Sequence, residues 1–168
     1  MQPSFQVGDK AVHPAHGVGE VTAIERRDIA GSTRAFYVLR ILDSGMKVMV
    51  PTLSSDNVGL RGVMSLGEAE NVLAVFRSGE KAVGNGPWNR RQRAYNEMIK
   101  SGSPYEVAKV LRDLYRIKFR DEKELSYGER RLMDQAKALL VKELALAKHL
   151  TEAQVETEIE TICADAAS

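Results

Sequence analysis

The chain has 168 residues, of which 43% are hydrophobic and 28% are charged, and its formal net charge is only +1. This composition is typical of a globular protein of one or two domains, and it excludes wholesale disorder. A membrane span requires about 20 consecutive apolar residues, and none is found, so we expect no association with a membrane. The single cysteine, Cys163, excludes an internal disulfide and a four-cysteine zinc site. With no leader-like segment at the N-terminus, we expect a cytoplasmic protein.

The first third of the chain is predicted to form β-structure. Apolar, mainly β-branched residues alternate with polar ones in three runs, at residues 17–29, 35–42 and 46–50. Turn-forming residues separate these runs at 30–32 and 43–45. Pro51 is expected to end the last strand, because proline has no N–H to donate to a central ladder. Short strands joined by short turns favour a small, strongly bent β-barrel.

The rest of the chain is predicted to be helical, because it repeats a helix-start signal. A Ser or Thr is followed three residues later by Glu or Gln at Ser65, Ser103, Ser126 and Thr151. In such a capping box the hydroxyl accepts a free backbone N–H, and the later side chain accepts the N–H of the cap residue. Gly86-Pro87 marks a fifth start. We therefore predict an α+β protein with a β-barrel domain at 1–67 and an all-α domain of about five helices at 68–168.

Positive charge is concentrated in the helical domain. Residues 88–123 contain 10 basic and 5 acidic side chains, which gives a local net charge of +5. The helix expected after Ser103 has an apolar stripe that we predict to be buried, formed by Val107, Val110, Leu111, Leu114 and Ile117. A second, basic stripe is predicted to lie on the outside, formed by Lys109, Arg112, Arg116 and Arg120. Such a surface attracts polyanions, although a solvated face paired with the acidic tail would have the same composition.

Residues that could carry out chemistry are sparse. His13 and His16 are three apart in a turn, and no third ligand is near, so we expect no metal site. The sequence contains no nucleophile elbow, phosphate loop or dinucleotide-binding motif, and Gly84-Asn-Gly86 is interpreted as a flexible connector. Acidic neighbours of Cys163 are expected to raise the pKa of its thiol. We therefore expect no cofactor and no enzymatic activity.

The segment Pro87-Trp88-Asn89-Arg90-Arg91-Gln92-Arg93 places the only tryptophan in the first turn of a helix, beside three arginines. One interpretation is a grip on distorted DNA, in which the cations bind phosphates and the indole stacks on an exposed base. The other interpretation is that Trp88 belongs to the core, because it shares a helix face with Tyr95 and tryptophan is usually largely buried. The residues alone favour neither.

Several motifs occur together and in the order of a known family. In the first domain they are Phe5-Gln-Val-Gly-Asp9, His13-Pro-Ala-His-Gly17, Phe36-Tyr-Val-Leu-Arg40 and Val48-Met-Val-Pro51. In the second they are Trp88-Asn-Arg-Arg91, Glu106-Val-Ala-Lys-Val-Leu-Arg-Asp-Leu114 and Leu125-Ser-Tyr-Gly-Glu-Arg130. On these motifs the chain resembles the CarD/CdnL family of bacterial RNA polymerase-binding transcription regulators, in its stand-alone CdnL form.

The resemblance implies a fold and a function. In the family, a Tudor-like, SH3-like barrel docks on the β subunit of RNA polymerase. The helical domain contacts promoter DNA in the minor groove at the upstream edge of the transcription bubble, with little sequence specificity. There the family's tryptophan, matched here by Trp88, props the fork open. The implied outcome is a stabilised open complex, including at ribosomal RNA promoters, without catalysis. The protein is then expected to be a monomer that associates with the nucleoid through polymerase.

The resemblance also assigns residues. Arg90 and Arg91 match DNA-contacting arginines of the family, and Arg93 extends the same DNA-binding group. Arg27 matches a polymerase-contacting arginine, whereas Met49 falls where some relatives carry a second one.

This departure implies that Phe36, Met49 and Pro51 form a more apolar contact with polymerase. The competing interpretation is that these three residues belong to the barrel core. Alternation places Met49 on the face opposite Val48 and Val50, and so outside if the valines are buried. A polymerase-independent nucleic-acid-binding module is kept as the alternative function.

Overall fold

The computed structural model describes residues 4–167 and confirms the predicted α+β architecture. The chain divides between Val63 and Met64 into two compact units, four residues before the boundary expected from the sequence. Met64 belongs to the helical unit because its side chain lies in the helical core. Its backbone N–H also donates to Oε2 of the buried Glu143, at 2.8 Å.

The first unit is an antiparallel sheet in the order β4-β3-β2-β1-β5. Its strands are β1 (Lys10–His13), β2 (Gly17–Ile29), β3 (Ser32–Ile41), β4 (Lys47–Pro51) and β5 (Arg61–Gly62). The three long strands were predicted, whereas β1 and β5 were not. The last strand of the predicted set ends at Pro51, which lies on the edge of the sheet, where a missing N–H disrupts no ladder. A short 3-10 turn, η1 (Thr52–Ser54), and α1 (Ser55–Val58) lead into β5.

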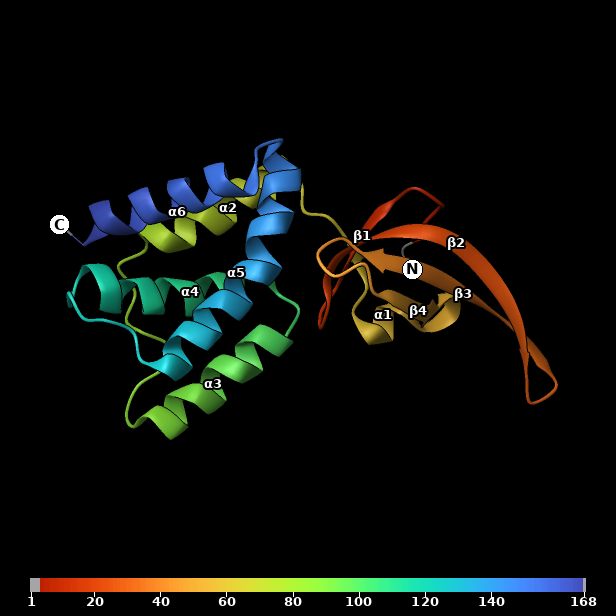
Figure 1. Ribbon diagram of the computed structural model, residues 1–168, viewed down its shortest axis with the longest axis horizontal. Coiled ribbons are helices and arrows are strands. Elements are labelled where there is room, and N and C mark those ends of the chain that lie inside the picture. Colours follow the sequence, from red (N-terminus) through yellow and green to blue (C-terminus); the bar gives the residue numbers. More distant parts are fainter. Residues whose placement is uncertain (1–3, 168) are drawn as a thin grey trace. The chain divides into compact units, whose positions relative to one another are not determined.

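Beyond the core, β2 and β3 continue as a curved two-stranded ribbon (Figure 1). Its tip is formed by Ala30 and Gly31, whose φ angles of 50° and 83° lie in the left-handed region that a two-residue hairpin turn requires. The barrel core lies on one face of the sheet. It consists of Phe5, Ala11, Val21, Tyr37, Leu39, Val50 and Leu60.

The second unit contains, within the described residues, the five predicted helices. They are α2 (Leu66–Arg77), α3 (Trp88–Lys100), α4 (Pro104–Phe119), α5 (Tyr127–Lys148) and α6 (Glu152–Ala166). The capping boxes at Ser65, Ser126 and Thr151 are complete. At Ser103 only half of the box forms, because the Ser103 N–H donates to Oγ of Ser101 instead of to the later glutamate. No helix in the part of the chain that the structure describes is long and apolar enough to cross a membrane.

Helix α4 is the centre of the helical unit and packs against α2, α3, α5 and α6 (Figure 1). Its predicted apolar stripe is buried, apart from the partly buried Ile117. The prediction of an outer basic stripe is wrong: the side chain of Arg112 is 1% exposed and that of Arg116 is 16% exposed. A helix that is surrounded by four others has little outer face for these residues to occupy. Of the stripe, Arg120 is exposed.

The buried Arg112 and the partly buried Arg116 instead hold the segment that follows α2. Arg116 donates from Nη2 to the Ser78 carbonyl at 2.7 Å, and Arg112 donates from Nη2 to the Lys81 carbonyl at 3.4 Å. Arg112 also lies 3.4 Å from Oδ1 of Asp113 and 3.6 Å from Oε2 of Glu80. Part of the positive charge that was predicted to lie on an outer surface is therefore used inside the fold.

Candidate nucleic-acid and polymerase interfaces

The segment that leads into Trp88 is anchored, so its interpretation as a flexible connector is corrected. Oδ2 of the buried Asp113 accepts the N–H groups of Val83 and Gly84, at 2.9 and 3.4 Å, and the Tyr95 hydroxyl, at 3.0 Å. Gly84 is buried against Tyr95, because a Cβ atom at this position would lie 2.6 Å from Cζ of the ring. The pKa of the Tyr95 hydroxyl is raised, mainly because the group is buried and to a smaller extent because the negative charge of Asp113 is near. One carboxylate thus fixes the chain a few residues before α3 begins.

Trp88 is the first residue of α3, as predicted, and its side chain is half-buried. The indole packs against the helical core and against the first turn of α5. A Cβ atom at Gly128 would lie 2.8 Å from Cζ2 and 3.1 Å from Nε1 of the indole. The structure therefore combines parts of both interpretations: Trp88 rests on the core and still presents surface to solvent.

The three arginines that follow Trp88 differ in their surroundings. Arg90 and Arg93 are exposed. Arg91 is half-buried and lies 3.3 Å, through Nη1, from Oε2 of Glu129, while its Cζ is 5.1 Å from the centre of the Trp88 ring. Burial of the Glu129 carboxylate alone would raise its pKa, but hydrogen bonds from Ser126 and Arg91 outweigh this and lower the pKa. The guanidinium of Arg91 is thus already paired with a carboxylate of the protein itself.

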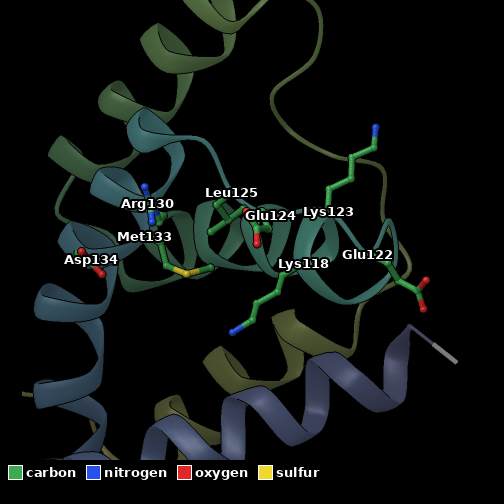
Figure 2. A pocket seen from close by; sticks show the side chains of 8 residues that line it. All are labelled: Lys118, Glu122, Lys123, Glu124, Leu125, Arg130, Met133 and Asp134. Carbon is green, nitrogen blue, oxygen red and sulfur yellow. The ribbon is translucent and has the colours of Figure 1, made fainter.

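Two surface hollows lie near this region. One, of about 570 Å³, runs along the polar face of α3 and is lined by Asn89, Gln92, Arg93, Asn96, Glu97 and Lys100. Apart from Arg93, these side chains were not predicted from the sequence, although amides spaced three and four apart on a basic helix are a signal for them. The other, of about 680 Å³, is shown in Figure 2 and lies between the end of α4 and the start of α5. Its lining contains as many carboxylates as cations, so it has no evident preference for an anion.

The four residues predicted to bind polymerase lie on one face of the sheet. Phe36 pairs with Pro51, and Val38 pairs with Met49. Because directly paired residues share a face and alternate residues along a strand do too, Phe36, Met49 and Pro51 lie opposite the barrel core. All three are half-buried. Alternation had predicted this placement of Met49.

Arg27 lies on the same face of the sheet, further along β2. It pairs with Arg34, two residues before Phe36, and its exposed side chain lies 3.2 Å from Glu25. Leu53, 86% exposed, follows two residues after Pro51 and was not singled out from the sequence. An apolar residue in a short turn after an edge strand gives no periodic signal that could have found it.

The residues considered for chemistry have ordinary surroundings. Nδ1 of His13 accepts the Ala15 N–H at 3.1 Å, and burial, followed by the charge of His16, lowers the pKa of His13. Among the side chains that the structure describes, no group of three could hold a metal ion. Cys163 is buried, and the pKa of its thiol is raised to about 12. The direction was predicted, but burial is the larger cause and Glu160 contributes less.

Comparison with known proteins shows to which family the chain belongs. The family of the CarD C-terminal domain matches residues 71–160, and that of the CarD-like/TRCF RID domain matches residues 5–64. The chain belongs to the CarD family. The CarD family is one of transcription factors rather than of enzymes, and membership supports a role in transcription regulation. The RID match further implies interaction with RNA polymerase.

Two individual proteins extend the comparison. A protein of Bacillus subtilis (strain 168), YdeB, provisionally named a transcription factor, is 35% identical over 153 residues. The match covers 91% of this CarD-family chain and 98% of YdeB. A solved structure, CdnLNt from Myxococcus xanthus, is 54% identical and covers 39% of this chain and 92% of its own, with a TM-score of 0.32.

Proposed function

We propose that this CarD-family protein docks on the β subunit of RNA polymerase and stabilises the open promoter complex, including at ribosomal RNA promoters. Its helical unit contacts DNA at the upstream edge of the bubble. The observation that carries the proposal is the half-buried Trp88 at the start of α3, flanked by the exposed Arg90 and Arg93, in a family that interacts with polymerase. The protein then acts as a monomer in the cytoplasm and associates with the nucleoid through polymerase.

The proposed DNA contact has an aromatic and a cationic part. An aromatic ring that stacks on an exposed base contributes roughly 1–3 kcal/mol, whatever the base. Arg90 and Arg93 supply phosphate contacts, which position a protein on DNA without reading its sequence. Pro87, the N-cap of α3, makes no side-chain cap bond, and its carbonyl accepts the N–H groups of Arg90 and Arg91. The N–H groups of Trp88 and Asn89 in the first turn are therefore the ones available to a phosphate. Such a surface suits many promoters.

The proposed effect is a shift in an equilibrium. A regulator moves the closed–open equilibrium only by binding the open state more tightly than the closed one. Each 1.4 kcal/mol of this difference is about a tenfold change in the equilibrium constant. Attachment of the barrel to polymerase raises the local concentration of the helical unit, so that a weak DNA contact suffices.

A direct experiment measures the lifetime of open complexes at a ribosomal RNA promoter after a competitor challenge, with and without the protein. We expect the full-length chain to lengthen this lifetime. The alternative is a polymerase-independent nucleic-acid-binding module, which requires DNA binding but no capture of the β subunit. Immobilised protein that binds promoter DNA but fails to retain purified polymerase would favour the alternative.

Met49→Asp is expected to weaken retention of polymerase at least tenfold and to leave the fold intact. The substitution places a charge in a half-buried apolar contact on the face opposite the core. Retention of purified polymerase and the melting temperature are measured on the same preparation. Val50→Asp is the matched control, because Val50 is 1% exposed and its substitution should unfold the barrel. If Met49→Asp also unfolds it, Met49 is a core residue and this surface is wrongly assigned.

Arg90→Ala combined with Arg93→Ala is expected to reduce affinity for all DNA sequences alike. Each lost phosphate contact reduces the steepness of the plot of log affinity against log salt concentration by about 0.9. The slope measured for the double variant should therefore be shallower by up to about 1.8. Fluorescence anisotropy with duplexes of different sequence, titrated over a salt range, measures both quantities. A loss confined to one sequence would mean that these arginines read bases instead.

A further inference from the structure

The first turn of α5 holds the indole of Trp88 through two neighbouring residues. Gly128 faces the ring so closely that an added Cβ atom would lie 2.8–3.1 Å from three of its atoms. Real Cβ atoms essentially never lie within 3.0 Å of another heavy atom, so a side chain at Gly128 requires the indole and the start of α5 to move apart. Glu129 reaches the same ring through Arg91, whose guanidinium lies over the indole.

The chain contains its own control for this arrangement. Ser65-Leu-Gly-Glu68 and Ser126-Tyr-Gly-Glu129 share the pattern Ser-x-Gly-Glu, and both capping boxes are complete. At Gly67 an added Cβ atom would meet only the Ser65 hydroxyl, at 3.9 Å, which is ordinary contact. The capping box itself therefore does not require a glycine at this position. At Gly128 the glycine is required by the neighbouring Trp88 ring.

Glu129 and Glu68, the glutamates of these two capping boxes, differ in the contacts of their carboxylates. Oε1 of Glu129 accepts the N–H of its cap residue, Ser126, at 2.9 Å, and its other oxygen, Oε2, accepts from both terminal nitrogens of Arg91, at 3.3 and 3.4 Å. Glu68 makes the equivalent cap contact with Ser65, at 3.5 Å. The carboxylate of Glu129 thus joins the start of α5 to the arginine that covers Trp88.

We infer that Gly128 and Glu129 are positioning residues for Trp88, with Arg91 as the link between Glu129 and the ring. Gly128 leaves the space in which one side of the indole lies. Glu129 fixes Arg91, so that Arg91 acts on the pose of the indole rather than as a free phosphate contact. The consequence for open complexes rests on the proposed function, whereas the consequence for the pose of Trp88 does not.

The pose can be measured directly, because Trp88 is the only tryptophan in the chain. In full-length Gly128→Ala, we expect a red-shifted emission maximum and stronger quenching by acrylamide, because the displaced ring gains solvent contact. The matched variant Gly67→Ala should leave both unchanged. Its melting temperature should not fall, since alanine is a better helix former than glycine. Unchanged emission and quenching in Gly128→Ala would overturn the inference.

Glu129→Gln tests the second residue without removing the cap. The chain shows that glutamine suffices for this purpose, because Gln154 accepts the N–H of Thr151 at 2.9 Å in the third capping box. The variant should keep its helix content by circular dichroism but show the same direction of change in Trp88 emission. Glu68→Gln is the control and should show no change. Equal spectra for Glu129→Gln and the wild type would remove Glu129 from the inference.

Open-complex lifetime separates this inference from the proposed function. We expect Gly128→Ala to shorten the lifetime about fivefold, as for the loss of about 1 kcal/mol of stacking. If Trp88 emission changes but neither Gly128→Ala nor Trp88→Ala alters the lifetime, the positioning holds and the proposed function fails. If Trp88→Ala shortens the lifetime and Gly128→Ala changes neither emission nor lifetime, the positioning fails and the proposed function holds.

Discussion

Replacing Trp88 by alanine is expected to shorten the lifetime of open complexes several-fold to about a hundredfold, while retention of polymerase stays unchanged. The range corresponds to the roughly 1–3 kcal/mol that an aromatic ring gains by stacking on a base. Polymerase retention should be spared, because the proposed polymerase contact lies in the other unit of the chain. Competitor-challenge kinetics and capture of purified polymerase, performed on the same preparation, measure the two quantities.

The half-burial of Trp88 calls for a stability control in this experiment. Removing a fully buried tryptophan costs about 3–5 kcal/mol, so a half-buried one should lower the melting temperature by less than a core residue would. Trp88→Phe keeps a flat apolar ring and should restore part of the lifetime. Recovery of the full lifetime by Trp88→Ala at low temperature, where the fold is intact, would show that Trp88 acts only through stability.

Asp113→Ala is expected to lower the free energy of unfolding of the helical unit by about 3–5 kcal/mol, since it leaves the buried charge of Arg112 without its inner partner. The side chains of Asp113 and Arg112 are 2% and 1% exposed. The substitution also removes the acceptor of two backbone N–H groups and of the Tyr95 hydroxyl. Urea unfolding followed by Trp88 fluorescence reports on this unit alone.

Glu80→Ala is the matched control, because Glu80 is the other carboxylate near Arg112 but is 66% exposed. Exposed ion pairs contribute at most about 1 kcal/mol, so this variant should unfold at nearly the wild-type urea concentration. Equal losses for the two variants would mean that the burial of Asp113 has no energetic consequence.

Local signals in the sequence predicted most of the fold. The capping boxes located four of the five helix starts, and proline located the start of α3. Alternation located the three long strands and placed Met49 opposite the core. These features depend on neighbours within a few residues, which is the range over which such patterns carry information. Strands β1 and β5 have four and two residues, which is too short for a period to be detected.

The features that the sequence could not predict depend on residues far apart in the chain. A spacing of three and four groups Arg112 with Arg116 on one face of α4, but it cannot reveal that other helices cover that face. The seat of Trp88 is formed by Gly128 and Glu129, about 40 positions later, and nothing local marks that glycine as different from Gly67. Sequence therefore identified the tryptophan but not what holds it.

The connection between the two units has a consequence for the entropy of binding. Only Val63 separates the end of β5 from Met64, the first core residue of the helical unit. Bringing together the ends of a flexible linker costs entropy that grows with the logarithm of its length, so each doubling removes about 0.6 kcal/mol of the gain from a second contact. A connection of this length has few torsions to lose. Inserting glycine and serine residues after Val63 should therefore shorten the lifetime of open complexes gradually as the insert grows, even though every contact surface stays intact.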